Sequence, residues 1–122
     1  MGKSVVIVDD SKFQTMQLGR FFADVLGFDV LASGENGEEA VELFRQHKPD
    51  LITMDLTMPE MDGLTCISKM MALKPDTRLM VISALGDAET AIEAVERGAN
   101  EYVVKPFSAE DLNLALDNLV GV

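Results

Sequence analysis

The chain has 122 residues, of which 48% are hydrophobic and 25% charged, and these values are typical of one globular domain. A formal net charge of −11 would repel a nucleic-acid backbone, so we expect no direct nucleic-acid binding. The single cysteine, Cys66, excludes an internal disulfide and a cysteine-based zinc site. No apolar stretch approaches the roughly 18 residues that span a bilayer, and no signal-peptide core follows Met1. We therefore expect a cytoplasmic domain over residues 1–122, away from any membrane.

Apolar runs that fit strands alternate with amphipathic stretches that fit helices along the whole chain. Runs that are apolar without interruption are typical of strands covered on both faces. The predicted strands cover 5–8, 28–32, 51–54, 78–82 and 101–104. Capping residues and glycine or proline stops bound the predicted helices, which lie at 11–27, 36–49, 63–72, 87–98 and from 108 onward.

This alternation of strands and helices predicts an α/β fold, with a parallel sheet and helices on both of its faces. Right-handed crossovers leave few topologies, and five strands suit the doubly wound, flavodoxin-like order 2-1-3-4-5. Ligands bind such sheets at the carboxyl ends of the strands. The polar residues at those ends are Asp9, Asp10, Asp55, Ser83 and Lys105. The sequence therefore predicts that the chemistry lies at one edge of the sheet.

Three carboxylates at that edge would repel one another, and a hard divalent cation would relieve the repulsion. Mg²⁺, with Mn²⁺ as a substitute, binds oxygen ligands at about 2.1 Å and keeps several waters, which leaves room for phosphate oxygens. An ionised aspartate such as Asp55 is a competent nucleophile towards phosphorus. Lys105 would neutralise charge on the transferred group, and the Ser83 hydroxyl would bind a phosphoryl oxygen. The sequence thus predicts that Asp55 accepts a phosphoryl group.

Four motifs, in this order, resemble the receiver domain of bacterial two-component response regulators. They are Val5-Val6-Ile7-Val8-Asp9-Asp10, Met54-Asp55-Leu56-Thr57-Met58-Pro59-Glu60-Met61-Asp62-Gly63, Ser83-Ala84 and Val104-Lys105-Pro106-Phe107. The resemblance covers nearly the whole chain. It implies that Asp55 takes its phosphate from the phosphohistidine of a sensor kinase or of a histidine phosphotransfer protein.

The resemblance also implies roles for the surrounding residues. The implied Mg²⁺ ligands are Asp9, Asp10, Asp55 and the backbone carbonyl of Thr57, and the implied phosphoryl-binding residues are Ser83 and Lys105. Tyr102 matches the family's switch aromatic, which turns inward as Ser83 moves toward the phosphate. The family pattern further implies a cis peptide bond between Lys105 and Pro106, which X-Pro chemistry permits.

Within the family, the residues at 53–63 and 83–86, and the end of the chain at Val122, resemble the stand-alone chemotaxis regulators. That resemblance implies control of an output partner, such as a flagellar motor switch component or a phosphatase. The surface that would change is made by the fourth helix, the fifth strand and the fifth helix. We expect a monomer and leave dimerisation on activation open. One alternative also stays open: the chain is the receiver of a phosphorelay, or of a larger regulator such as a transcription factor whose output domain is absent.

Two other classes of protein also place acidic or phosphate-binding residues at the strand ends of an α/β fold, but each needs a feature that this sequence lacks. An aspartate-nucleophile phosphatase of the haloacid-dehalogenase type usually needs an acid two residues after the nucleophile, where this chain has Thr57, and no cap insertion is present. A flavodoxin-like cofactor binder needs a phosphate-cradling loop after the first strand, and Asp9 and Asp10 would repel a flavin phosphate. We therefore expect a phospho-accepting switch rather than an enzyme. It would catalyse only its own phosphorylation and slow dephosphorylation.

Overall fold

One five-stranded parallel sheet organises the protein, and its strand order is β2-β1-β3-β4-β5. The computed structural model describes residues 3–57 and 62–120, so Met58, Pro59, Glu60 and Met61 of the second motif lie outside the described residues. The strands are β1 (Ser4–Val8), β2 (Asp29–Gly34), β3 (Leu51–Met54), β4 (Arg78–Ser83) and β5 (Glu101–Val104). The helices are α1 (Lys12–Arg20), α2 (Gly37–His47), α3 (Gly63–Leu73), α4 (Ala88–Arg97) and α5 (Ala109–Val120). The predicted α/β class and strand order are confirmed.

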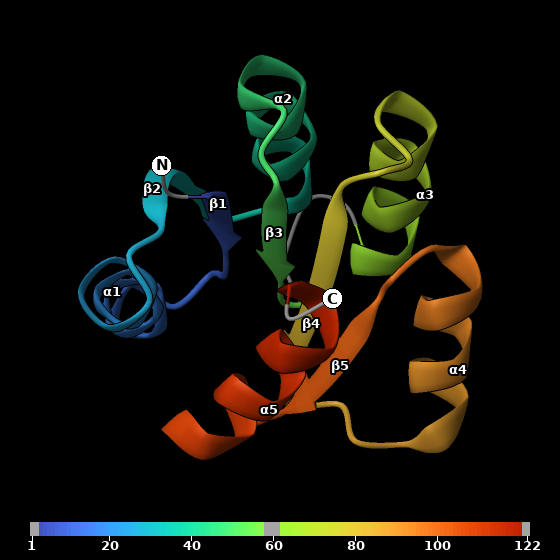
Figure 1. Cartoon of the computed structure of the whole chain (residues 1–122). Coiled ribbons are helices and arrows are strands. Elements are labelled where there is room, and N and C mark those ends of the chain that lie inside the picture. The colour runs from blue at the N-terminus through green and yellow to red at the C-terminus, as the bar shows by residue number, and fades with distance from the viewer. Residues whose placement is uncertain (1–2, 58–61, 121–122) are drawn as a thin grey trace.

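Helices cover both faces of the sheet (Figure 1). On one face α2, α3 and α4 contribute Phe44, Ile67 and Ala94 to a core against β1, β3 and β4. On the other face α1 and α5 contribute Leu18 and Leu116 to a second core. Burial on both faces explains why the strands are apolar throughout rather than alternating. Among the residues that the structure describes, no helix is long and apolar enough to cross a membrane.

Local capping sets the helix starts as the sequence predicts. The Ser11 hydroxyl accepts a hydrogen bond from the Gln14 amide at 3.2 Å at the start of α1. The Asn36 side chain accepts from the Glu39 amide at 2.9 Å at the start of α2. Each cap satisfies an amide that would otherwise lack a partner in the first helical turn.

The end of the first helix differs from a regular α-helix. Phe21–Val25 forms a π-helical turn, which places Phe22 fully inside the core. The Phe22 and Phe28 rings then pack edge to face with their centroids 5.2 Å apart. Because the Phe28 amide donates to the Phe22 carbonyl at 2.8 Å, Phe28 closes the helix instead of starting the strand. The second strand consequently begins at Asp29, one residue later than predicted.

Helix α4 keeps much of its apolar surface in solvent. Ala94, a residue of α4, is buried, whereas Ile92 and Val95 of the same helix are exposed. The strand beside it, β5, is the edge of the sheet, so no further strand–helix unit covers the outer face of α4 (Figure 1). This face is therefore an apolar surface without a partner among the described residues.

Candidate phospho-acceptor site

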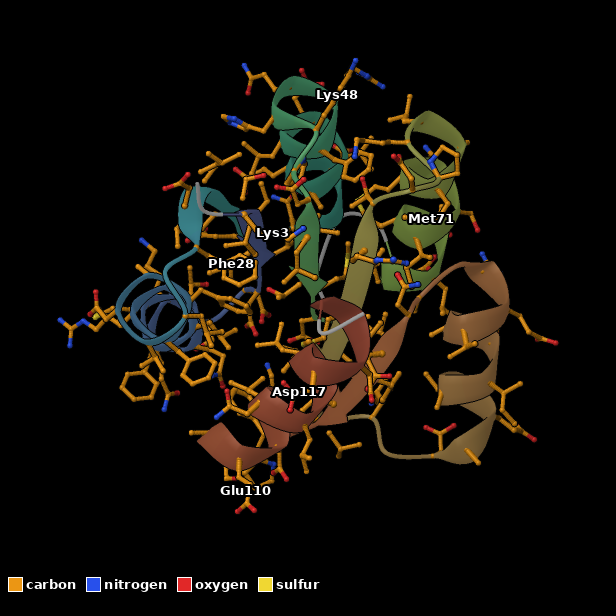
Figure 2. All side chains as sticks on the ribbon, in the orientation of Figure 1. Lys3, Phe28, Lys48, Met71, Glu110 and Asp117 are labelled. Atoms are coloured by element: carbon orange, nitrogen blue, oxygen red, sulfur yellow. The ribbon has the colours of Figure 1, made fainter. Side chains whose placement is uncertain are left out.

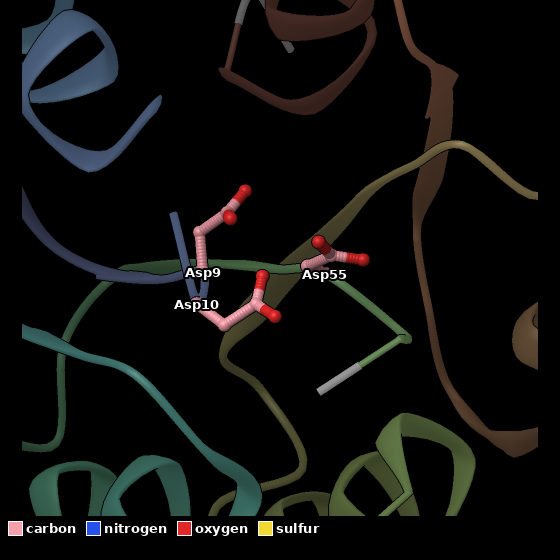
Figure 3. Close-up of side chains that lie close together, drawn as sticks. All are labelled: Asp9, Asp10 and Asp55. Carbon is pink, nitrogen blue, oxygen red and sulfur yellow. The ribbon is translucent and has the colours of Figure 1, made fainter. Parts of the chain in front are cut away.

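Three carboxylates converge where β1 and β3 end. One oxygen from each of Asp9, Asp10 and Asp55 lies within 4.8 Å of the others (Figure 3). The parallel register pairs Val8 with Met54, so the next residues of the two strands are neighbours. The Asp55 amide donates to the Val8 carbonyl at 3.0 Å and continues that ladder. Asp9 and Asp55 are almost fully buried, whereas Asp10 is exposed.

Lys105 joins this acidic group from the end of β5. Its Nζ donates to Asp9 Oδ2 at 2.8 Å and to Asp55 Oδ2 at 3.0 Å. Burial alone would lower the pKa of Lys105, but the hydrogen bonds to the two carboxylates outweigh it and the pKa is raised. Lys105 is therefore a cation at neutral pH. The peptide bond between Lys105 and Pro106 is cis.

Backbone amides hold the other oxygen of each buried carboxylate. Asp9 Oδ1 accepts from the Ser11 amide at 2.9 Å. Asp55 Oδ1 accepts from both the amide and the hydroxyl of Thr57, each at 3.0 Å. Asp9 and Asp55 thus each accept hydrogen bonds from the following loop through Oδ1 and from Lys105 through Oδ2. These amide contacts were not predicted from the sequence, although an aspartate followed two residues later by an amide donor is the usual Asx-turn spacing.

Ser83 and Tyr102 meet at the loop that follows β4. The fully buried Ser83 hydroxyl accepts from the Leu85 amide at 3.2 Å. The Tyr102 hydroxyl donates to the carbonyl of the same Leu85. Burial raises the pKa of Tyr102, so its hydroxyl stays protonated as this donor. The Ser83 hydroxyl therefore binds the backbone of this loop, and Leu85 links it to Tyr102. Among the described residues, no hydrogen bond joins Ser83 to Asp55.

The three carboxylates suit a hard divalent cation. They present oxygen ligands only, and Mg²⁺ typically takes one or two carboxylates while it keeps several waters. The exposed position of Asp10 leaves one side of the group open to solvent. The donor set therefore fits Mg²⁺, as the sequence predicts. For Thr57, the contacts in the structure are those of its amide and hydroxyl with Asp55.

Comparison with known proteins places this site in a family. The model of the response regulator receiver domain matches residues 5–117. The chain belongs to the response regulator receiver domain family. The Chemotaxis protein CheY of Bacillus subtilis (strain 168) is 42% identical over 124 residues, which cover 99% of this chain and 100% of that protein. The Chemotaxis protein CheY of Thermotoga maritima is 41% identical, and the match covers 98% of each chain.

Solved receiver structures have the same fold. The CheX-CheY-BeF3-Mg²⁺ complex from Borrelia burgdorferi matches with a TM-score of 0.91 and 35% identity, over 96% of this chain and 88% of that chain. A receiver of this kind also occurs within longer proteins. A protein-glutamate methylesterase/protein-glutamine glutaminase of Paramagnetospirillum magneticum is 46% identical over 84% of this chain, which corresponds to 29% of that protein.

Proposed function

We propose that this receiver accepts a phosphoryl group on Asp55 from a phosphohistidine of a sensor kinase or of a histidine phosphotransfer protein. The observation that carries the proposal is the position of Asp55 directly after the end of β3, the middle strand of the sheet. The carboxylates of Asp9 and Asp10 lie on one side of it, and the Lys105 ammonium binds its Oδ2. A nucleophile that lies beside a metal-binding pair of carboxylates and contacts a fixed cation is the arrangement that phosphoryl transfer requires.

In the transfer, Asp55 Oδ2 forms a bond to phosphorus while the bond from phosphorus to the donor imidazole nitrogen breaks. The electron pair of that bond stays on the imidazole, which ends as a neutral ring once its protons equilibrate with solvent. Asp55 Oδ1 stays on the Thr57 amide and hydroxyl, which keeps the carboxylate oriented throughout. Lys105 already lies 3.0 Å from the attacking oxygen and neutralises charge on the phosphoryl group. A Mg²⁺ ion held by Asp9, Asp10, Asp55 and the Thr57 carbonyl would supply further charge neutralisation.

The product is an acyl phosphate that stays on the protein, so the function is that of a switch. Thr57 stands where an aspartate-nucleophile phosphatase usually has its leaving-group acid. The chain then catalyses its own phosphorylation and slow dephosphorylation and turns over no other substrate.

The signal would travel through the loop after β4. Ser83 moves toward the new phosphoryl group, and Leu85 links that motion to Tyr102 because its amide and carbonyl bind the two side chains. Tyr102 lies on β5, between α4 and α5 (Figure 1). The surface of α4, β5 and α5 is therefore the proposed output surface, whose two states the phosphate biases.

The pathway proposed is chemotaxis, with a flagellar motor switch component or a phosphatase as the output partner. The support is the full-length match to two proteins named Chemotaxis protein CheY. A receiver of a phosphorelay, or of a longer regulator, remains the second candidate because similar receivers form part of longer proteins.

Incubation with a small phosphodonor and Mg²⁺ tests the acceptor. Mass spectrometry should show one added phosphate, and Asp55→Asn should abolish it. Asp76→Asn, a change at an exposed acid remote from the site, is the matched control and should keep the modification. An unchanged modification in Asp55→Asn would rule out Asp55 as the acceptor.

A pull-down from lysate, with and without beryllofluoride and Mg²⁺, tests the pathway. Recovery of a histidine kinase together with a flagellar switch component would support chemotaxis. Recovery of a histidine phosphotransfer protein alone would favour a relay.

A further inference from the structure

A hollow of about 260 Å³ lies where the strands begin, at the edge of the sheet opposite the phospho-acceptor site. Lys3 directly precedes β1, Asp50 directly precedes β3, and Arg78 is the first residue of β4, and all three line the hollow. Parallel strands start at the same edge, and the register pairs Leu51 of β3 with Arg78 of β4. The residues that line this hollow are therefore different from those that form the phospho-acceptor site.

Three of the ten basic residues of the chain line this hollow, and they are Lys3, Lys74 and Arg78. Such a group is unexpected in a chain whose formal net charge is −11. Lys74 Nζ lies 3.5 Å from Asp76 Oδ1, so this lysine is already paired. Among the residues that the structure describes, Lys3 and Arg78 form no ion pair. Two cations at the hollow thus remain available for a ligand.

The two carboxylates at the hollow are both held by groups of the protein. Asp50 Oδ2 accepts from the Ser4 amide at 2.9 Å and from the Ser4 hydroxyl at 3.1 Å. The hydrogen bond from that amide, together with the nearby Lys3 and Lys74, holds the pKa of Asp50 below its ordinary value. Asp76 is the partner of Lys74. Three cations therefore face two carboxylates, and positive charge is in excess at this hollow.

Hydrogen bonds fix the backbone around the hollow. The Arg78 amide donates to the Asp50 carbonyl at 3.0 Å, and the Thr77 hydroxyl donates to the Pro49 carbonyl at 3.3 Å. The Thr77 amide also donates to the Lys74 carbonyl at 3.2 Å, which closes the turn between α3 and β4. A wall that is already ordered spares a ligand the entropy cost of ordering it.

Apolar side chains line the same hollow beside the cations. Leu51 and Leu119 are buried, and Phe28 is half-buried. The contact between Phe28 and Phe22 described above, with ring centroids 5.2 Å apart, holds the Phe28 ring in place. Figure 2 shows Phe28 and Lys3 close together. The hollow thus offers a fixed aromatic ring next to an exposed cation.

We infer that this hollow binds the dianion of a small phosphate monoester. Such an ester carries up to two negative charges at neutral pH, which match the two cations, Lys3 and Arg78, that have no ion pair among the described residues. The planar guanidinium of Arg78 can bind two phosphate oxygens at once. The organic part of the ester would pack on the Phe28 ring, whereas a carboxylate ligand would supply only one charge. The inference is independent of the proposed function, because the two sites share no residue.

Nuclear magnetic resonance on the ¹⁵N-labelled full chain, with a chelator to remove divalent ions, tests the inference. The probe is phenyl phosphate, which joins a phosphate dianion to one aromatic ring. Three controls each lack one feature of the probe: inorganic phosphate lacks the ring, benzoate carries a single charge, and phenol is uncharged. Phenyl phosphate should shift the amide signals of Leu51, Thr77 and Arg78. Inorganic phosphate and benzoate should bind more weakly, and phenol should shift none of these signals.

Paired variants separate specific binding from a general effect of charge. Lys3→Gln with Arg78→Gln should weaken the binding of phenyl phosphate about fivefold, because two exposed ion pairs with the ligand are lost. Both residues are exposed, so we expect the variant to fold. Arg20→Gln with Lys69→Gln removes the same charge from exposed positions on α1 and α3, and it should weaken binding less than about twofold.

A change at Asp76 tests the opposite direction. Asp76→Asn removes the partner of Lys74 and should strengthen the binding of phenyl phosphate about twofold. Weaker binding by this variant, or equal weakening by the two pairs of cation variants, would overturn the inference. Binding of any of the three control ligands as tight as that of phenyl phosphate would do the same, as would shifts confined to the signals around Asp55 and Lys105.

Discussion

Lys105 bridges two buried carboxylates that come from different strands. Its Nζ lies 2.8 Å from Asp9 Oδ2 and 3.0 Å from Asp55 Oδ2. Two carboxylates this close would destabilise each other unless a cation lay between them. The lysine therefore has a structural role besides its proposed part in phosphoryl transfer, and the two roles can be measured independently.

Replacing Lys105 by methionine should destabilise the metal-free protein. The change leaves Asp9 and Asp55 as buried charges without their cation, and we expect a loss of about 2 kcal/mol, below the value for a fully buried pair because the lysine is partly exposed. Saturating Mg²⁺ should recover part of the loss. Urea unfolding with and without Mg²⁺ measures both. Lys12→Met is the matched control, since it removes an exposed lysine whose Nζ lies 3.8 Å from Glu35 Oε1 at the surface. Equal effects of the two variants would contradict the bridging role.

Replacing Thr53 by valine should leave the stability unchanged or raise it by about 1 kcal/mol. The Thr53 hydroxyl is buried in β3 and has no hydrogen-bond partner among the described residues. Valine has nearly the same shape and removes an unsatisfied polar group. Thr77→Val makes the same change where the buried hydroxyl donates to the Pro49 carbonyl at 3.3 Å, and it should cost about 1 kcal/mol. The urea midpoint of Thr77→Val should therefore fall, whereas the midpoint of Thr53→Val should stay the same or rise.

Replacing Gly63 by alanine should both destabilise the protein and slow its phosphorylation. A Cβ at Gly63 would lie 2.6 Å from the Leu56 Cα, and Leu56 directly follows Asp55. Backbone must shift to relieve that clash, at a cost of about 2 kcal/mol. Gly19→Ala is the control, because the nearest atom to its Cβ is Ile7 Cδ1 at 4.0 Å and alanine favours helix α1. If adduct formation by a small phosphodonor is as fast in Gly63→Ala as in Gly19→Ala, the predicted coupling is wrong.

The cap of α3 should make the stability depend on pH in acid. The Thr65 amide and hydroxyl donate to Asp62 at 2.9 and 2.8 Å, and these hydrogen bonds lower the pKa of Asp62 below its ordinary value of 3.8. A carboxyl whose folded pKa is depressed stabilises the fold above its unfolded pKa, and the contribution is lost as pH falls through the folded pKa. The stability difference between the wild type and Asp62→Asn should be present at about pH 6 and shrink toward about pH 3.

Unfolding of both proteins across this pH range measures the effect. Thr65→Val retains the amide donor and loses only the hydroxyl, so it should remove part of the dependence on pH. A difference between wild type and Asp62→Asn that stays constant down to about pH 3 would contradict the assignment to this carboxyl.

Much of the fold could be predicted because its determinants are local. The caps at Ser11 and Asn36 depend on a side chain and an amide three residues apart, which a linear sequence displays directly. The apolar strands required burial on both faces, and the strand–helix alternation then left few topologies. The convergence of Asp9, Asp10 and Asp55 followed from that topology alone, because parallel strands end at one edge.

Other features depended on which surfaces meet in three dimensions. Periodicity shows that α4 is amphipathic, but only the packed structure shows that Ile92 and Val95 remain in solvent, because the sheet ends at β5. The π-helical turn that buries Phe22 depends on its contact with Phe28 and has no local signature.

The sequence by itself determined the fold class, the acceptor candidate Asp55 and the group of acids around it, since each follows from residue type and order. Only the tertiary structure decided how these groups are held. Lys105 is distant from Asp9 and Asp55 in the chain, and a bridge between them forms only once β1, β3 and β5 are placed in the sheet. Hydrogen bonds between distant side chains depend on a geometry of a few tenths of an ångström, which packing sets and residue order does not.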